Sequence, residues 1–139
     1  MNKKIAIIGG GNLGVAIAEG LIKSEFVLPG HIIVTKRNIR TIAHLEEKGV
    51  LVTSDNNEAV RFADLVLLAV KPFQVADVIA NLKKDITTKH VLVSVITGVS
   101  LNDLGEMAKK KIPVFRAMPN TAIAIQQSMT CISHANADS

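Results

Sequence analysis

The chain has 139 residues, of which 48% are hydrophobic, but it contains only four Phe and no Trp or Tyr. This length suits one domain and not easily two, and a core of Ile, Val, Leu and Ala is typical of a parallel sheet buried under helices. The net charge is +4, but Lys and Arg are scattered apart from the short run Lys109–Lys111. Without a basic stripe or stacking aromatic residues, the sequence argues against a nucleic-acid-binding protein.

Other classes of site are also disfavoured. The single cysteine, Cys131, excludes an intramolecular disulfide, and the four histidines have no metal-ligand spacing among themselves or with it. No apolar run approaches the ~20 residues of a membrane span. A strand candidate directly after Met1 leaves no room for a signal peptide. We therefore expect a cytoplasmic protein with no metal site and no contact with nucleic acid or membrane.

The predicted elements alternate between strands and helices. In chain order they are strand Ile5–Ile8, helix Asn12–Lys23, strand His31–Thr35, helix Asn38–Lys48, strand Val50–Thr53, helix Asp55–Phe62, strand Leu65–Val70, helix Val75–Leu82, strand Val91–Ile96, helix Asn102–Lys110, strand Val114–Ala117 and strand Met129–Ser133. In the first helix Leu13, Ile17 and Leu21 share one face. Asn38 and Asp55 are suited to cap helix N-termini, and Gly49 is suited to end a helix.

This alternation predicts the fold class. Successive strand–helix–strand units build a parallel sheet with right-handed crossovers. We therefore expect an α/β fold with a doubly wound, mostly parallel, Rossmann-type sheet, as one domain over residues 1–139.

A glycine-rich turn follows the first predicted strand. Gly9, Gly11 and Gly14 satisfy the G-x-G-x-x-G spacing directly after a strand and before an amphipathic helix, which is the context that a dinucleotide-binding motif requires. Gly9 permits the sharp turn, Gly11 lets a pyrophosphate approach the backbone, and Gly14 lets the helix lie close to the sheet. The helix N-terminus then offers free N–H groups to the phosphates.

The end of the second predicted strand indicates which dinucleotide binds. Enzymes that use NAD usually place Asp or Glu there to bind the ribose 2′-hydroxyl. This chain has Thr35, Lys36 and Arg37 instead, so two cations and a hydroxyl are available for a 2′-phosphate. The sequence therefore favours NADP(H) over NAD(H), although the same residues also suit an ordinary loop of a basic protein.

Four segments together carry a resemblance to a known family: Ile7–Gly14, Asp64–Pro72, Ser94–Leu101 and Arg116–Thr121. The chain resembles the N-terminal domain of pyrroline-5-carboxylate reductase, the last enzyme of proline synthesis, over essentially its whole length. Many families share the glycine motif. The segments Ala-Val-Lys-Pro at 69–72 and Arg-Ala-Met-Pro-Asn-Thr at 116–121 point to few.

The resemblance implies a reaction and a set of site residues. NAD(P)H would give a hydride to the C=N bond of 1-pyrroline-5-carboxylate and form L-proline. Together with the glycine motif, the resemblance places the cofactor against Ile8, Gly9, Gly10, Gly11, Asn12, Leu13, Gly14, Thr35, Lys36, Arg37, Asn56, Ala69, Val70, Lys71, Pro72, Thr97, Gly98 and Asn120. Asn120 and Thr97 are the candidate catalytic residues, and the proton donor is unassigned.

Several of these positions have simpler interpretations. Lys71 and Pro72 follow a buried strand, at the sheet edge where such folds bind ligands. Lys71 also suits a solvated strand end, and Gly98 and Asn120 suit turns without a ligand. The family often has Pro where this chain has Ala122, and a Gly-rich step where this chain has Gln126–Ser128. The resemblance therefore gives weaker support for the family's roles in the loop near the substrate.

The family also carries a second, helical domain that supplies the dimer interface and much of the substrate site. This chain ends at Ser139, and its tail from Ser133 is polar and lacks a core-forming pattern. We therefore expect a truncated product or an isolated domain with little turnover, from a parent enzyme that is a homo-oligomer through the second domain. One alternative is a deazaflavin-dependent or β-hydroxyacid-type NADP reductase, but residues 116–121 argue against it. A second alternative is a non-catalytic dinucleotide-binding regulatory module.

Overall fold

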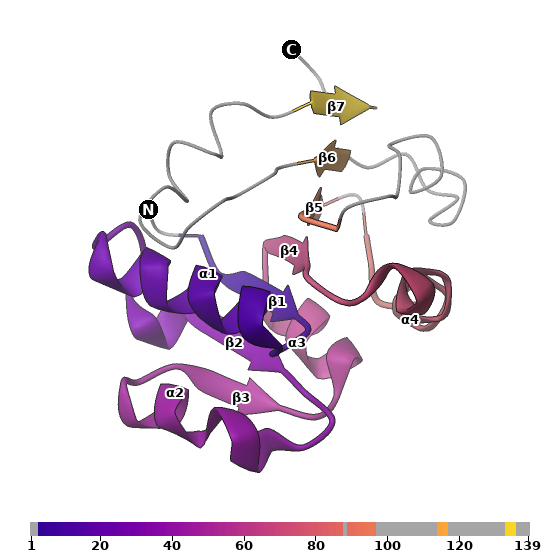
Figure 1. Ribbon diagram of the computed structural model, residues 1–139. Helices are drawn as coiled ribbons and strands as arrows, with labels where there is room; N and C mark the ends of the chain where they lie inside the picture. The colour runs from indigo at the N-terminus through magenta and orange to yellow at the C-terminus, as the bar shows by residue number, and fades with distance from the viewer. Residues whose placement is uncertain (1–2, 88, 97–113, 117–132, 136–139) are drawn as a thin grey trace.

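A twisted sheet runs through the centre of the computed structural model, which describes residues 3–87, 89–96, 114–116 and 133–135 (Figure 1). Its strands are β1 (Ile5–Ile8), β2 (Ile32–Thr35), β3 (Leu51–Thr53), β4 (Leu65–Leu68), β5 (Val91–Ser94), β6 (Val114–Arg116) and β7 (Ser133–Ala135). They lie in the order β3-β2-β1-β4-β5-β6-β7. The first six are parallel to one another, and β7 is antiparallel to β6.

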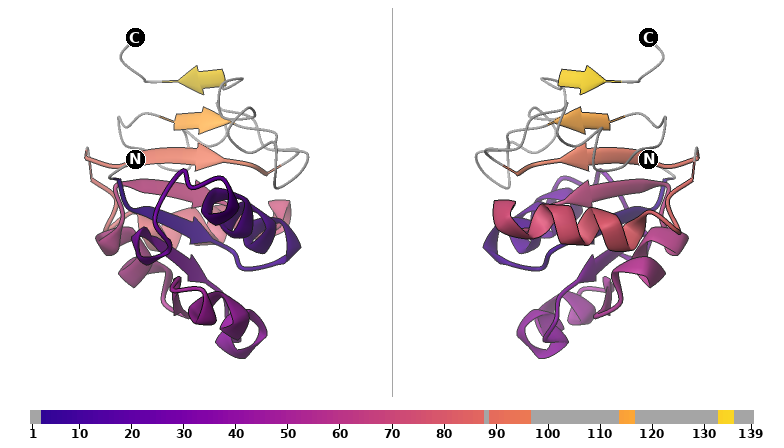
Figure 2. Two further views of the ribbon diagram at one scale, coloured as in Figure 1. Left: turned by 90° about the vertical axis from the view of Figure 1, so that its left-hand side faces the viewer. Right: turned by 90° about the vertical axis from the view of Figure 1, so that its right-hand side faces the viewer.

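Helices cover both faces of this sheet. The α-helices are α1 (Asn12–Lys23), α2 (Ala43–Glu47), α3 (Asn56–Phe62) and α4 (Val75–Leu82), and the 3₁₀ helices are η1 (Pro29–His31), η2 (Ile39–Ile42) and η3 (Pro72–Gln74). Figure 2 shows α1 in front of the sheet from one side and α4 in front of it from the other. The doubly wound α/β fold predicted from the sequence is therefore confirmed.

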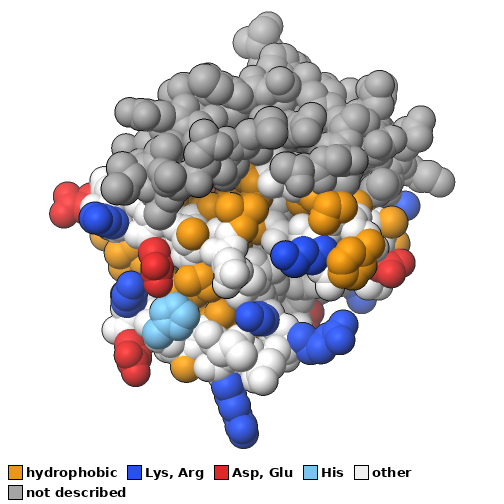
Figure 3. Space-filling model, viewed as in Figure 1, with side chains coloured by type: hydrophobic (Ala, Val, Ile, Leu, Met, Phe, Trp, Pro, Cys, Tyr) orange, Lys and Arg blue, Asp and Glu red, His pale blue; other side chains and the backbone are white. Residues whose placement is uncertain are grey.

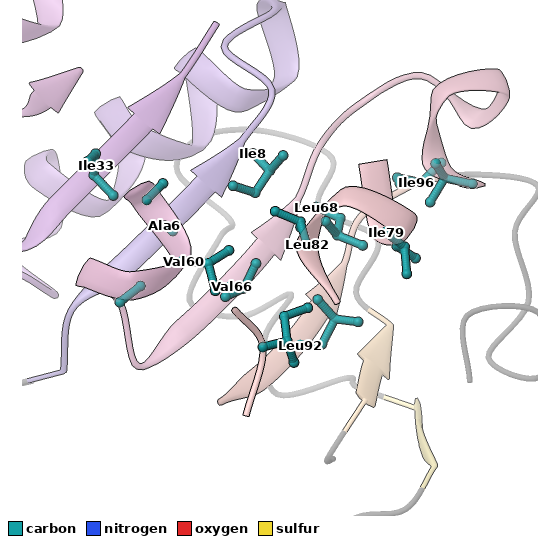
Figure 4. Close-up of a cluster of buried hydrophobic side chains, with 14 residues drawn as sticks. Ala6, Ile8, Ile33, Val60, Val66, Leu68, Ile79, Leu82, Leu92 and Ile96 are labelled. Carbon is teal, nitrogen blue, oxygen red and sulfur yellow. The ribbon is translucent and has the colours of Figure 1, made fainter. Parts of the chain in front are cut away.

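The alternation of side chains along each strand divides the core into two layers. In β1, Ile5 and Ile7 pack toward α1 and α2, whereas Ala6 and Ile8 pack toward α3 and α4. Figure 4 shows the second layer, in which side chains of the strands meet those of α3 and α4. Burial of one Leu or Ile side chain contributes about 1.5–3 kcal/mol, so the two layers hold the sheet between its helices.

Local capping follows the sequence closely. The Asn38 side chain accepts a hydrogen bond from the Arg40 N–H at 3.2 Å, and Asp55 accepts from Asn57 at 2.9 Å. Gly49 has a φ of +96°, and its N–H donates to the Glu46 carbonyl. Both predicted caps and the predicted stop are confirmed, because each depends on neighbours along the chain.

Element lengths differ from the sequence prediction in several places. The segment from Asn38 to Lys48 is one turn of 3₁₀ helix, η2, followed by the short helix α2. The strands predicted to reach Val70 and Ile96 end at Leu68 and Ser94, because the apolar run continues past the last ladder hydrogen bonds. Leu13, expected on the buried helix face with Ile17 and Leu21, is 39% exposed, whereas the other two are buried.

The last described strand lies in the polar tail, which was expected to carry no core-forming element. It spans Ser133–Ala135, whereas four of the five residues of the predicted strand Met129–Ser133 lie outside the described residues. Because backbone groups alone make its ladder with β6, this strand needs no apolar pattern. The predicted helix Asn102–Lys110 lies outside the described residues, as do residues 117 and 129–132.

Candidate functional site

A cavity of about 920 Å³ opens at the carboxyl edge of the sheet. It lies where the strand order reverses between β1 and β4, the position at which open α/β sheets bind ligands. It is lined by Gly9, Gly10, Gly11, Asn12, Leu13, Thr35, Lys36, Arg37, Ser54, Asn56, Ala69, Val70, Lys71, Pro72, Gln74, Val78, Val95 and Ile96. The segments that follow five strands, β1 to β5, therefore meet in one hollow, which is large enough for a cofactor.

The turn after β1 leaves no room for side chains at two of its glycines. Gly9 has a φ of +112°, and a Cβ there would lie 2.8 Å from the Ala69 carbonyl oxygen. A Cβ on Gly14 would overlap the Gly9 carbonyl oxygen. By contrast, a Cβ on Gly11 would meet no protein atom within 4 Å. The space at Gly11 is therefore open toward the cavity, as a phosphate-binding turn requires.

The helix that follows this turn has an N-terminus without a side-chain cap. Gly11 is the N-cap residue and makes no side-chain hydrogen bond, and the first turn of α1 contains no acidic residue. The N–H groups of this turn have no intrahelical acceptors, and the helix dipole adds a partial positive charge. The arrangement can bind an anionic group such as a phosphate.

Three residues at the end of β2 form the adjoining wall of the cavity. Lys36 is half-buried and Arg37 is exposed, and neither has an ion-pair partner in the part of the chain that the structure describes. Thr35 is 2% exposed, and its hydroxyl accepts a hydrogen bond from the Gly9 N–H at 3.2 Å. Figure 3 shows several Lys and Arg side chains at the centre and lower right of one face of the molecule. This wall suits an anion.

The connection after β4 forms the opposite wall. The Lys71 N–H donates to the side-chain carbonyl oxygen of Gln74 at 3.0 Å, and Pro72 begins η3, which leads into α4. The backbone of Ala69 is bonded to the end of β1, since its N–H donates to the Ile8 carbonyl at 2.9 Å. A proline at the first helical position fixes the entry to the helix, so this wall is well defined.

The cavity includes most, but not all, of the residues predicted for it. Ile8 and Gly14 are buried and do not line it, because Ile8 points into the core and Gly14 lies under the turn. Thr97, Gly98 and Asn120 lie outside the described residues. The remaining thirteen predicted cofactor-binding residues line it: Gly9, Gly10, Gly11, Asn12, Leu13, Thr35, Lys36, Arg37, Asn56, Ala69, Val70, Lys71 and Pro72.

Five further residues of the wall were not predicted: Ser54, Gln74, Val78, Val95 and Ile96. Ser54 directly follows β3, and Val95 and Ile96 directly follow β5. The rule that ligands bind beyond the carboxyl ends of parallel strands would have identified these three. Gln74 and Val78 belong to η3 and α4, and no local signal marks them. Within the described ranges, no cluster of three His, Cys, Asp or Glu side chains is placed to hold a metal, and no helix there is long and apolar enough to cross a membrane.

Comparison with known proteins agrees with this geometry. The model of the family described as "NADP oxidoreductase coenzyme F420-dependent" matches residues 4–98. Pyrroline-5-carboxylate reductase 1 of Dictyostelium discoideum is 42% identical over 129 residues, which cover 93% of this chain and 23% of that protein. Pyrroline-5-carboxylate reductase 2 of the same organism is 39% identical over 136 residues, covering 96% of this chain and 46% of that protein.

A solved structure shows the same likeness. A pyrroline-5-carboxylate reductase from Coxiella burnetii superposes with a TM-score of 0.81 at 35% identity, over 89% of this chain and 47% of that one. The resemblance stated from the sequence is confirmed by these matches. The chain spans half or less of the length of these relatives.

Proposed function

Because this chain belongs to the family described as NADP oxidoreductase coenzyme F420-dependent, we propose that residues 1–139 form the NADP(H)-binding domain of a reductase that resembles pyrroline-5-carboxylate reductase. One observation carries the proposal: the open space at Gly11 lies beside an uncapped helix N-terminus, in a cavity that Lys36 and Arg37 also line. Family membership supports a nicotinamide cofactor, and the finer choice of NADP(H) rests on these residues.

The residues present fit such a cofactor. The turn Gly9–Gly11 and the first N–H groups of α1 would hold the pyrophosphate, because a Cβ at Gly11 would fill space that the protein leaves empty. Lys36 and Arg37 would hold a ribose 2′-phosphate. When bound, the reduced cofactor supplies a hydride, and this chain binds and orients the dinucleotide that carries it. Thr97, Gly98 and Asn120 stay predictions for the nicotinamide end.

The preference for NADP(H) follows from charge. Lys36 and Arg37 have no carboxylate partner in the described part of the chain, so their charges are free to meet a phosphate. Each charge-assisted hydrogen bond contributes about 1.5–3 kcal/mol, which corresponds to roughly a tenfold preference or more. NADH lacks the 2′-phosphate and therefore cannot form these hydrogen bonds.

The substrate and the assembly are proposed from the relatives. The activity we propose for the whole protein is reduction of the C=N bond of 1-pyrroline-5-carboxylate to L-proline in proline biosynthesis, in a homo-oligomer joined through a second domain. A cytoplasmic location stays a prediction. Hydride transfer needs the imine and the nicotinamide in near-attack geometry, and a misplacement of ~1 Å can cost about 100-fold in rate. We therefore expect residues 1–139 to bind NADPH and to reduce this substrate negligibly.

The test is a calorimetric titration of the chain with NADPH and NADH, followed by an assay with 1-pyrroline-5-carboxylate. We expect tighter binding of NADPH, negligible turnover by residues 1–139, and activity in a longer chain that adds a helical half. Absence of dinucleotide binding would contradict the proposal. Substantial turnover by residues 1–139 would show that the catalytic groups lie within them, and Asn120 and Thr97 are then the first residues to substitute.

The family description favours a second candidate, a deazaflavin-dependent NADP oxidoreductase. The match ends at residue 98, before the Arg116–Thr121 segment that distinguishes the two in the sequence. An assay of the longer chain with a deazaflavin in place of the imine separates them. If neither substrate reacts while NADPH binds, the domain serves as a non-catalytic dinucleotide-binding module.

A further inference from the structure

Buried hydroxyl groups mark the carboxyl ends of three strands. Among the residues that the structure describes, the buried polar ones are His90 and three at strand ends: Thr35 in β2, Thr53 in β3 and Ser94 in β5. Thr35 lies in register with Thr53 on one side and with Ile8, the last residue of β1, on the other. Each hydroxyl therefore lies where the chain leaves the sheet and enters the connection that follows the strand.

Two of these hydroxyls serve their own connection. The Thr53 hydroxyl accepts a hydrogen bond from the Asp55 N–H at 3.1 Å, and that of Ser94 accepts from Ile96 at 3.2 Å. Both bonds join a residue to the second one after it, a common local turn. Thr35 differs, because its hydroxyl accepts from Gly9, 26 positions earlier in the chain and on the neighbouring strand's connection.

We propose that Thr35 is a positioning residue: its buried hydroxyl holds the Gly9 N–H and thereby sets the glycine turn for the cofactor pyrophosphate, instead of contacting the 2′-phosphate itself. The inference rests on the proposed function. Thr35 is 2% exposed, although Lys36 and Arg37 directly after it are half-buried and exposed. The side chain therefore faces the turn, and the two cations that follow it supply the charge for a phosphate.

The turn depends on this contact because the Thr35 hydroxyl is the acceptor for the Gly9 N–H. Gly9 has no side chain, and its backbone lies at a φ of +112° with no space for a Cβ. Its N–H is partly buried, so loss of the acceptor leaves a donor that water reaches poorly. The hydroxyl thus ties the end of β2 to the turn after β1, and the 2′-phosphate wall and the pyrophosphate turn stay in a fixed relation.

Thr35→Val tests this, because it keeps the shape of the side chain and removes the acceptor. Since the pyrophosphate is common to both cofactors, we expect NADPH and NADH to bind about three- to tenfold more weakly, with an unchanged ratio between their affinities. Adenosine 2′-monophosphate, which lacks the pyrophosphate, should bind Thr35→Val as it binds the original chain. Thr35→Ser restores the hydroxyl and should restore both dinucleotide affinities.

Thr53→Val is the matched control. It removes the same kind of bond from the neighbouring strand end, and Thr53 does not line the cavity. We expect a similar loss of thermal stability and dinucleotide affinities within about twofold of the original. Equal weakening by both variants would overturn the proposal, because the effect would then be general to buried strand-end hydroxyls.

Two other outcomes would also overturn it. If Thr35→Val weakens NADPH and adenosine 2′-monophosphate but not NADH, the hydroxyl is a direct ligand of the 2′-phosphate. If no affinity changes, the hydroxyl does not position the turn. Amide hydrogen exchange at Gly9 requires no ligand and should be faster in Thr35→Val than in Thr53→Val. This readout tests the turn even if the original chain binds no dinucleotide, in which case the proposed function fails separately.

Discussion

Two βα connections on the same edge of the sheet begin their helices in opposite ways. After β3, Asp55 caps α3, and its carboxylate accepts hydrogen bonds from the N–H groups of Asn57 at 2.9 Å and Glu58 at 3.3 Å. After β1, Gly11 caps α1 without a side-chain hydrogen bond. One helix N-terminus is closed by the chain's own carboxylate, and the other is left open beside the cavity.

The difference shows that the same fold can close one helix N-terminus with a side chain and leave another without a cap. An N-cap carboxylate stabilises a helix by satisfying its first N–H groups, typically by about 1 kcal/mol. At α1 the chain forgoes that stabilisation, and the first turn carries no acid. The N–H groups that correspond to those Asp55 satisfies at α3 therefore have no side-chain cap at α1, and this is the strongest structural support for the proposed phosphate site.

The largest expected effect comes from giving α1 the cap that α3 has. In Gly11→Asp the new carboxylate has space, since a Cβ there meets no protein atom within 4 Å, and the φ of −77° suits any residue. We expect dinucleotide affinity to fall at least about 100-fold through occlusion and like-charge repulsion, while stability stays equal or rises by a few tenths of a kcal/mol. Calorimetry and thermal unfolding measure the two quantities.

Gly11→Val is the uncharged control for that variant. It should also abolish binding, because the side chain occupies the pyrophosphate's space, and it should leave the fold intact. A folded Gly11→Val protein with undiminished affinity would place the ligand elsewhere in the molecule.

Gly14→Ala should act on stability instead of on the ligand. Its Cβ would overlap the Gly9 carbonyl oxygen, so α1 must move away from the turn. Overpacking of this kind costs about 1–3 kcal/mol, and we expect a loss near 2 kcal/mol in denaturant unfolding. Unchanged stability of Gly14→Ala would show that the close approach is not required.

Moving an acid to the end of β2 should separate the two cofactors. In Arg37→Asp a carboxylate replaces the exposed guanidinium at the cavity wall, as in enzymes that bind the ribose 2′-hydroxyl of NAD. We expect NADPH affinity to fall about tenfold or more and NADH affinity to hold or rise, which erases or reverses the preference. Equal affinities of the original chain for NADPH and NADH would refute the charge argument. Gly11→Asp, by contrast with Arg37→Asp, should weaken the binding of both cofactors alike.

The smallest expected effect comes from removing the side-chain cap of α3. Asp55→Ala removes the α3 cap, and we expect a loss of about 1 kcal/mol in the free energy of unfolding. NADPH affinity should stay within about twofold, because Asp55 does not line the main cavity. Asp55→Asn, which can still cap, should recover most of the stability. A large loss of affinity in Asp55→Ala would mean that the two connections are not independent.

The parts predicted well from the sequence are those in which cause and effect lie within a few residues. Asn38 and Asp55 bond to N–H groups two or three positions later, and Gly49 ends its helix through its own backbone. The glycine spacing predicted the turn after β1 for the same reason. The described strand β7 was not predicted, since its pairing with β6 is made by backbone groups and needs no pattern in the side chains.

By itself, the sequence determined the order of strands and helices from β1 to β5, the glycine turn and the cations after β2, because periodicity, φ preference and charge are properties of neighbouring residues. The tertiary structure alone decided which connections meet. It brought Gln74 and Val78 to the cavity, set Ile8 and Gly14 behind it, and joined the Thr35 hydroxyl to Gly9 across 26 positions. Contacts of that range depend on strand order and register, which arise from packing the whole sheet against its helices and leave no local trace in the chain.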